Sequence, residues 1–387
     1  MSRYADIIKK KQKDWNCEEL MSSANREAGS KIPFSSPLMN YCTYGGIPRA
    51  AITEFFGDPG GGKTTTSVDI CKNAVVMFES EYDAEVAKLQ DVLSNGKNPA
   101  VSAQLADLQD RGPKRVLYID LEHSFDKKWS KTLGIDDSKI DVMQPPDVVA
   151  EDILQTMQEI IETGEIGLIV LDSVPSLVPR NELEKKIGER TVAALAGVLT
   201  VHLRKVVPLL KRYDTTIIYI NQTRDNLDNP YVVNTPGGKG LKFYASLRML
   251  FKIGTPVDFL GNELPSNTEN PAGYIVTAKL VKQKSAPWDR KLGSYYLMCN
   301  SGIRIDMDYA NLAVKKYGII HKAGAWFTLT VPGTGEVLVN ESGLPVKLNG
   351  MSKVFDYLQE NPEYFKLIQD YIMNDINNTP SEVIENE

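Results

Sequence analysis

A glycine-rich stretch has the residue types and spacing of a phosphate-binding loop. It reads G-x-x-x-x-G-K-T and consists of Gly57, Asp58, Pro59, Gly60, Gly61, Gly62, Lys63 and Thr64, followed by Thr65. Backbone N–H groups at a helix N-terminus attract anions, and glycines let the backbone close around phosphates. We expect Lys63 to reach the β- and γ-phosphates and Thr64 to hold Mg²⁺. The stretch predicts a nucleoside triphosphate site.

The neighbouring sequence fits this prediction. Residues 52–56 are β-branched and aromatic, which is typical of a strand, and residues 65–78 carry apolar side chains at helical spacing. A plain glycine-rich turn before a helix is the alternative. Because a strand, the loop and a helix follow one another in the required order, the phosphate site is favoured.

Three further apolar stretches, 116–120, 166–171 and 215–220, end in polar residues. Ligands of parallel sheets bind beyond the carboxyl ends of the strands, so these residues should gather around the phosphates. We expect Asp172 to be the Mg²⁺ carboxylate, although a strand-end cap would look the same. Glu122 is the candidate general base for the attacking water, and Gln222 the candidate sensor of the γ-phosphate.

The pattern of strands and helices predicts an α/β core with a mostly parallel sheet and helices on both faces. Strands that follow one another from residue 247 should add antiparallel members. The expected organisation is an N-terminal helix and strand (1–40), the core (41–308) with an inserted helical hairpin (79–114), a small α-rich region (309–378) and a disordered acidic tail (379–387).

Composition sets limits on the class of protein. The chain has 387 residues, 42% hydrophobic residues and a formal net charge of -6, which is ordinary for a soluble globular protein. Four scattered cysteines without metal-ligand spacing indicate a reducing compartment. We find neither a signal peptide nor an apolar run of membrane-spanning length, so a cytoplasmic protein is expected. A local basic groove for nucleic acid is not excluded.

Two long polar loops follow strand ends. Residues 184–193 carry Lys185, Lys186 and Arg190, and residues 223–236 lead into Gly237 and Gly238. Long loops in a compact domain are usually functional or disordered. A loop attached to a γ-phosphate sensor would be a nucleotide-gated binding element.

Several motifs together resemble the RecA-type strand-exchange recombinases, in particular a bacteriophage member. The resemblance extends from about residue 29 to 329 with one insertion. It rests on GDPGGGKTT, YIDLEHSFD, LIVLDSVPSLVP, INQTR, GGKGLKFYASLR, LVKQKSAPW and HKAGAWF. Phosphate loops are common among NTPases, whereas KFYASLR and AGAWF in this order are specific.

The resemblance implies ATP and Mg²⁺ as cofactors and gives roles to individual residues. Asp126 and Trp129 match the positions that hold adenine, although Trp129 could be a surface-helix anchor. Lys282 and Lys284 match the lysines that reach the neighbouring subunit's ATP, although a solvated strand edge would read the same. Phe243 matches a subunit-interface aromatic, with a core residue as the alternative. Ile32 and Phe34 lie where the family's polymerising strand is expected.

The two polar loops match the DNA-binding loops of the family. The implied DNA-binding residues are Lys185, Lys186, Arg190, Arg204, Arg224, Tyr231, Gly237 and Gly238. The second loop differs from bacterial members at nearly every position, and Gly197 replaces a basic residue. Tyr231 is the aromatic residue expected to stack on bases.

The implied function is an ATP-dependent recombinase that forms head-to-tail helical filaments on single-stranded DNA and pairs it with homologous duplex DNA. A loading protein or a single-strand-binding protein is a candidate partner, and no membrane is expected. The alternatives are a hexameric helicase of the same core fold and a nucleotide-switched recombination mediator. Intact Lys63, Thr64, Glu122, Asp172 and Gln222 argue against the mediator.

Overall fold

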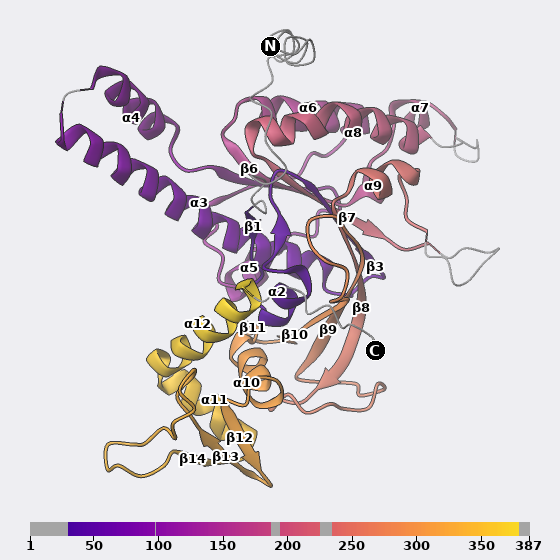
Figure 1. The fold of residues 1–387 in the computed structure, drawn as a ribbon. Coiled ribbons are helices and arrows are strands. Elements are labelled where there is room, and N and C mark those ends of the chain that lie inside the picture. The colour runs from indigo at the N-terminus through magenta and orange to yellow at the C-terminus, as the bar shows by residue number, and fades with distance from the viewer. Residues whose placement is uncertain (1–29, 97, 187–193, 225–233, 379–387) are drawn as a thin grey trace, which may run out of the picture. The chain divides into compact units, whose positions relative to one another are not determined.

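A nine-stranded sheet organises the chain in the computed structural model, which describes residues 30–96, 98–186, 194–224 and 234–378 (Figure 1). Contacts divide the chain into Met1–Ser30 and Lys31–Glu387, and the elements below belong to the second unit. The predicted N-terminal helix and acidic tail lie outside the described residues.

Six neighbouring strands of the sheet are parallel, and three antiparallel strands extend it. The order is β11-β10-β9-β8-β3-β7-β6-β4-β5, in which β8, β3, β7, β6, β4 and β5 are the parallel members. Their bounds are β3 Ile52–Gly57, β4 Arg115–Asp120, β5 Ile140–Met143, β6 Ile166–Asp172, β7 Thr216–Gln222, β8 Leu247–Val257, β9 Gly273–Gln283, β10 Leu292–Met298 and β11 Gly302–Ile303. The predicted mostly parallel α/β sheet is confirmed.

One expectation about this sheet was wrong. The stretch that begins at residue 247 was expected to be antiparallel, but β8 pairs in parallel with β3 and only its other neighbour, β9, is antiparallel. The short helix α9 (Gly238–Tyr244) lies between β7 and β8 and forms the crossover that lets β8 run parallel to β3. The succession of strands without helices therefore begins after β8.

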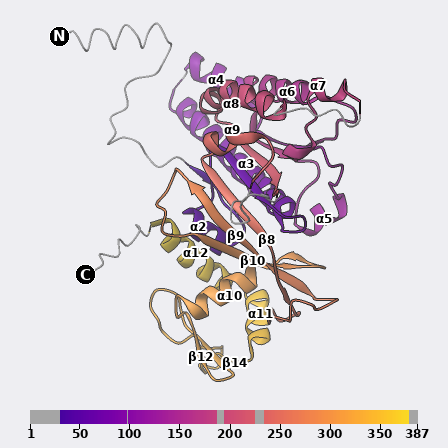
Figure 2. The same ribbon diagram turned by 90° about the vertical axis from the view of Figure 1, so that its right-hand side faces the viewer.

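Helices cover both faces of the sheet (Figure 2). Alternate residues of β7 face opposite sides, so that Ile218 and Ile220 pack with α2 (Pro37–Thr43) and α3 (Lys63–Ser94). Ile217 and Tyr219 pack instead with α6 (Ala150–Glu162), α8 (Ala194–Tyr213) and α9. Both faces being buried explains the continuous apolar strands of the sequence.

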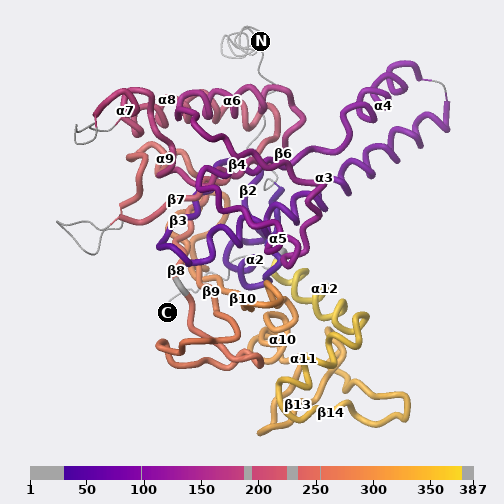
Figure 3. Tube along the Cα trace, turned by 180° about the vertical axis from the view of Figure 1, so that it is seen from behind, coloured from indigo at the N-terminus to yellow at the C-terminus, as the bar shows by residue number. Residues whose placement is uncertain are grey.

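The helix after the phosphate loop is longer than expected. Instead of ending near residue 78, α3 runs without interruption for 32 residues, and α4 (Pro99–Arg111) packs back against it. Figure 3 shows this hairpin extending beyond the sheet. Only its first half covers the core, since Leu89 is the one buried residue that α3 contributes after Phe78, and none of α4 is buried.

The C-terminal region is a mixed α/β unit. The helices α10 (Ile305–Lys315), α11 (Met351–Glu360) and α12 (Pro362–Asn378) accompany a three-stranded antiparallel sheet of β12 (Ile320–Ala323), β13 (Trp326–Leu329) and β14 (Lys347–Asn349). They share a separate hydrophobic cluster. The strands were missed in the sequence because each has only three or four residues.

The strand expected to bind a neighbouring subunit belongs to the chain's own core. Strand β1 (Lys31–Ile32) pairs with β2 (Ile47–Pro48), and the side chains of Ile32 and Phe34 are buried in the cluster beneath α3. Burial of these two side chains ties the strand to its own subunit. The subunit-interface role of Ile32 and Phe34 stays a prediction.

None of the helices in the described ranges combines the length and the apolarity that crossing a bilayer requires.

A buried ion pair joins the three central strands. Glu54 of β3 lies opposite Arg248 of β8 and is 0% exposed; the guanidinium Nε donates to one carboxylate oxygen. The other oxygen accepts a hydrogen bond of 2.9 Å from the Asn221 amide of β7. Arg248 also stacks on Phe56, with its guanidinium carbon 4.5 Å from the ring centroid. Both oxygens of the buried Glu54 carboxylate are thus hydrogen-bonded, as burial of a charge demands.

Replacing Glu54 by Ala should lower the free energy of unfolding by roughly 3–5 kcal/mol, because it leaves the Arg248 charge buried without a counter-ion. Urea denaturation would measure the change. Asp370→Ala is the matched control, since it removes an exposed ion pair with Lys366 and should cost about 1 kcal/mol or less. Equal losses in the two variants would contradict this account.

Candidate functional site

The phosphate loop joins β3 to α3 at the carboxyl edge of the parallel strands. The backbone of Gly57 has φ 149°, and a Cβ there would lie 2.1 Å from the carbonyl oxygen of Phe251 in the neighbouring strand β8. No other residue fits this position. The loop is thus pressed against the sheet at its first residue and opens into the N-terminus of α3 at its last.

Lys63 lies folded over the loop. Its ammonium group donates to the carbonyl oxygens of Gly57 at 2.9 Å and Asp58 at 2.7 Å. Burial lowers the pKa of Lys63, while Asp172, Glu122 and Asp58 act in the opposite direction. These contacts hold the ammonium group at the loop, where a phosphate oxygen would be a stronger, charged partner.

Thr64 and Asp172 meet as the sequence predicted. The Thr64 hydroxyl donates to Asp172 Oδ2 at 2.9 Å, and the phenol of Tyr118 donates to the same oxygen at 2.7 Å. Burial raises the pKa of Asp172 to about 6, and Glu122 and Asp120 add to the increase. A hydroxyl and a carboxylate are hard oxygen ligands that suit Mg²⁺, which takes its remaining ligands from water and substrate phosphates.

No cluster of three His, Cys, Asp or Glu side chains that could hold a metal ion occurs among the residues that the structure describes. Tyr118 was missed in the sequence, because nothing in a buried apolar strand shows that one phenol faces a carboxylate.

Glu122 and Gln222 also lie together. The Gln222 amide donates to Glu122 Oε1 at 3.2 Å, and the Ser173 hydroxyl donates to the same oxygen. The candidate base is therefore held by groups from two other strand ends. A further link joins Asp58 of the phosphate loop, which accepts from the Thr223 hydroxyl at the start of the second polar loop. No local pattern in the sequence indicates the contacts of Ser173 and Thr223.

Asp126 and Trp129 lie at the start of α5 (Lys127–Thr132). Asp126 Oδ1 caps this helix by accepting from the backbone N–H groups of Lys128 at 2.7 Å and Trp129 at 3.1 Å. The Trp129 indole is partly buried against the core and donates to the Thr65 hydroxyl at 3.4 Å. The predicted adenine-binding residues are thus adjacent to the phosphate-loop helix.

The comparison with known proteins gives the family. The family described as RecA N-terminal domain matches residues 82–304. The chain is 32% identical to the RecA protein of Thermus aquaticus over 328 residues, covering 84% of this chain and 79% of that protein. It is 29% identical to RecA of Thermotoga maritima (86% and 79% covered) and 29% identical to RecA of Aquifex aeolicus (89% and 83% covered).

The chain belongs to the RecA family. The predicted resemblance to RecA-type recombinases is confirmed, whereas a bacteriophage origin stays a prediction. The matched range of the family begins after the phosphate loop, so that loop is assigned from its own sequence and geometry.

The lysine pair of this RecA-family chain faces α9. Lys282 donates to the carbonyl oxygens of Lys242 at 2.6 Å and Phe243 at 2.8 Å, and Lys284 donates to that of Phe243 at 3.0 Å. Burial, followed by the charges of Lys284 and Arg248, lowers the pKa of Lys282 to about 8. The Phe243 side chain is 71% exposed, which excludes the core alternative. Its interface role stays a prediction.

The predicted DNA-binding residues are only partly described. Arg190 and Tyr231 lie outside the described residues. Lys185, Lys186 and Arg204 are exposed, and Arg224 closes the base of the second loop by backbone pairing with Asn234.

Gly238 lets α9 approach α8, since a Cβ there would lie 2.7 Å from the Ala196 Cβ. Gly237 is the N-cap of α9, so the visible role of both glycines is packing, and their DNA contacts stay predictions.

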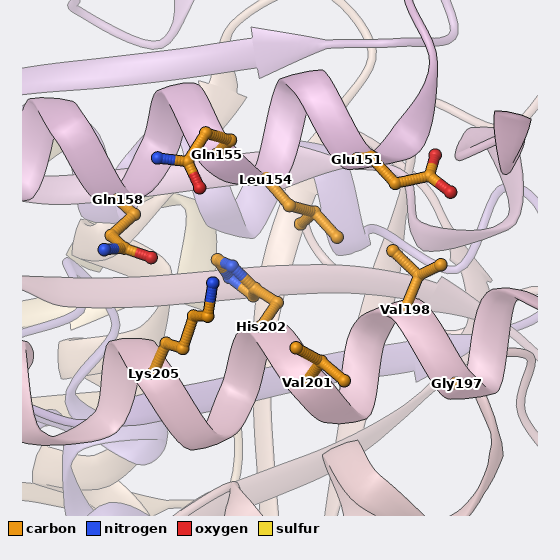
Figure 4. Close-up of a pocket in the computed structure, with 9 residues that line it drawn as sticks. All are labelled: Glu151, Leu154, Gln155, Gln158, Gly197, Val198, Val201, His202 and Lys205. Carbon is orange, nitrogen blue, oxygen red and sulfur yellow. The ribbon is translucent and has the colours of Figure 1, made fainter.

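A separate cavity of about 340 Å³ lies between α6 and α8, away from the phosphate loop (Figure 4). Leu154 and Gln158 of α6 point across it toward His202 of α8. The His202 ring is buried, and its Nε2 lies 2.8 Å from the Tyr219 hydroxyl. Burial, aided by Lys205, lowers the pKa of His202 to about 4, so the imidazole is neutral at pH 7. The geometry indicates a helix-packing residue.

His202 should make stability depend on pH. Because its folded pKa lies below 6.5, the unfolded chain takes up the proton first as pH falls, so stability is full above pH 6.5 and is lost toward pH 4. Relative to His202→Gln, the wild type should lose about 2 kcal/mol of unfolding free energy between pH 7 and pH 5. Urea denaturation at both pH values tests this; parallel pH profiles for the two proteins would contradict it.

Proposed function

We propose that this RecA-family protein is an ATP-dependent homologous recombinase. It polymerises head to tail on single-stranded DNA, binds ATP and Mg²⁺ at the loop that ends in Lys63 and Thr64, and pairs the bound strand with homologous duplex DNA. The observation that carries the proposal is the convergence of Glu122, Gln222 and the Thr64–Asp172 pair at one sheet edge. Family membership supports the recombination activity.

In this proposal Glu122 accepts a proton from the water that attacks the γ-phosphate, and Ser173 and Gln222 orient its carboxylate. Lys63 and the backbone N–H groups of the loop bind the phosphate oxygens. Thr64 and Asp172 would hold Mg²⁺, which would supply positive charge next to the phosphates. A γ-phosphate would compete with Glu122 for the Gln222 amide, and Gln222 immediately precedes the second polar loop. The presence or absence of the γ-phosphate would thereby change the position of Gln222 and, through it, of the second polar loop that is proposed to bind DNA.

Lys282 and Lys284 supply positive charge to the ATP of the neighbouring subunit. Their partners in the single chain are neutral carbonyl oxygens, and a phosphate of the neighbour would be a stronger partner. Such an interface is heterologous and builds an open helix when its rotation does not close. The helicase alternative would close into a ring, and no observation favours it. We propose a cytoplasmic location, in the bacterial host cell if the protein is phage-encoded, and a loader or single-strand-binding protein as a candidate partner.

ATP hydrolysis should be stimulated by single-stranded DNA in the wild type and reduced at least about 100-fold in Glu122→Gln and Lys282→Ala. Phosphate release would be measured with and without DNA, and the same samples imaged by negative stain for helical filaments. Lys279→Ala is the matched control, because Lys279 is an exposed lysine of the same strand β9 without a predicted role. Closed rings with unchanged Lys282→Ala activity would favour the helicase, and no hydrolysis by the wild type would leave a binding switch.

Mixing the two inactive variants tests whether the lysine acts between subunits. In a filament of equal parts Glu122→Gln and Lys282→Ala, about one quarter of the interfaces would join an intact Glu122 to an intact Lys282. Hydrolysis should therefore return to about a quarter of the wild-type rate in the mixture. A mixture as inactive as each variant alone would show that both residues act within one subunit.

A further inference from the structure

Two buried hydroxyl groups, those of Tyr295 and Thr66, lie behind the phosphate loop, on the side away from the expected nucleotide. Tyr295 of β10 and Val276 of β9 are cross-strand partners, and both lie against Gly62, the N-cap of α3. A Cβ at Gly62 would lie 2.9 Å from Val276 Cγ1 and 3.1 Å from the Tyr295 hydroxyl oxygen. The antiparallel extension of the sheet thus supports the last residue of the loop before Lys63.

The hydrogen bonds run in one direction, from Tyr295 to the loop. The Thr66 hydroxyl donates to the Gly62 carbonyl oxygen at 2.8 Å, which uses its only proton. The Tyr295 hydroxyl lies 2.8 Å from the Thr66 oxygen and is also within 3.4 Å of the Gly62 carbonyl oxygen, to which it can donate. With the Thr66 proton on Gly62, the single phenol proton goes to the nearer acceptor, the Thr66 oxygen. Tyr295 and Thr66 are buried, and burial raises the pKa of the Tyr295 phenol. The phenol therefore keeps its proton.

Fixing this carbonyl group fixes the opposite side of the same peptide unit. The Gly62–Lys63 peptide is planar and trans, so its C=O and N–H point in opposite directions. With the carbonyl oxygen bound by the Thr66 backbone N–H at 2.9 Å and by the hydroxyl pair, the Lys63 N–H is directed out of the helix N-terminus. This N–H is one of the donors expected to bind phosphate. Gly62 has φ 88°, so without such support its flexible backbone could turn the peptide.

We infer that Tyr295 is a positioning residue for nucleotide binding, which acts through Thr66 to orient the Gly62–Lys63 peptide of the phosphate loop. The inference rests on the proposed function, since it presupposes a nucleotide at this loop. Tyr295 is a positioning residue and not a catalytic one, because it is buried behind the loop. Its contribution should be the same in the ground state and the transition state, so it should affect KM more than kcat.

Four substitutions separate this role from simple packing. Tyr295→Phe keeps the ring and removes only the donor. Tyr296→Phe is the matched control, since its hydroxyl lies 3.3 Å from the Asn311 amide and on the other face of β10. Thr66→Ser keeps the relaying hydroxyl, whereas Thr66→Val removes it.

Mg²⁺–ADP binding by isothermal titration calorimetry, and KM and kcat for ATP with single-stranded DNA, would be measured on the full chain. Tyr295→Phe should raise Kd and KM about three- to ten-fold, the effect of one buried neutral hydrogen bond, with kcat within about twofold of the wild type. Tyr296→Phe and Thr66→Ser should remain within about twofold of the wild type, and Thr66→Val should match Tyr295→Phe. The double variant, Tyr295→Phe with Thr66→Val, should bind nucleotide no more weakly than Thr66→Val alone, because the phenol acts through the Thr66 hydroxyl.

Unchanged nucleotide affinity in Tyr295→Phe, or additive losses in the double variant, would overturn the inference and leave the proposed function intact. A wild type that binds no nucleotide would overturn the proposed function itself. If Tyr295→Phe does not fold, the comparison of Thr66→Ser with Thr66→Val decides: equal affinities overturn the inference, and a loss confined to Thr66→Val supports it.

Discussion

The buried ion pair between Glu54 and Arg248 is the interaction on which the arrangement of the site depends. Together with the Asn221 amide it ties β3, β7 and β8 to one another beneath their carboxyl ends. A charge pair taken out of water is costly unless its geometry and its remaining hydrogen bonds are complete. That requirement favours one register of the three strands, and this register sets the relative positions of the phosphate loop, Gln222 and the start of the antiparallel extension.

The carboxyl edge above this pair brings groups from four strands into two neighbouring hydrogen-bonded clusters. The Asp172 carboxylate accepts hydrogen bonds from Thr64 and Tyr118. The Glu122 carboxylate accepts hydrogen bonds from Ser173 and Gln222. Preorganised dipoles in a partly buried site need little rearrangement when charge develops on a substrate. Asp58 of the phosphate loop accepts a hydrogen bond from Thr223, so groups near the expected phosphate site also hold the start of the second polar loop.

The helix α9 connects the second loop to the lysine pair. It begins at Gly237, packs closely on α8 at Gly238, and ends at carbonyl groups that bind Lys282 and Lys284. Cations near a helix C-terminus are favoured by the helix dipole. A displacement of the second polar loop would therefore shift α9 and the carbonyl groups that bind Lys282 and Lys284, the lysines proposed to reach the neighbouring subunit. The exposed Phe243 belongs to the last turn of α9, next to these carbonyl groups.

The phosphate loop, the acidic and amide residues at the strand ends, and the mostly parallel α/β sheet could all be predicted from the amino-acid sequence. These features are local: a glycine-rich turn, an apolar run and the residue that ends it are all read within about ten neighbouring positions. The RecA family could likewise be recognised from motifs of this kind, in a fixed order along the chain.

Which side chains face one another across strands could be seen only in the folded chain. The burial of Ile32 and Phe34 in their own subunit, the parallel pairing of β8, and the contacts of Tyr118, Ser173 and Tyr295 join residues far apart in the chain. Tyr295 lies 229 positions from Thr66 in sequence, yet the two hydroxyl oxygens are 2.8 Å apart. No local pattern encodes such a pair, because it depends on sheet order and register, which the whole core fixes together.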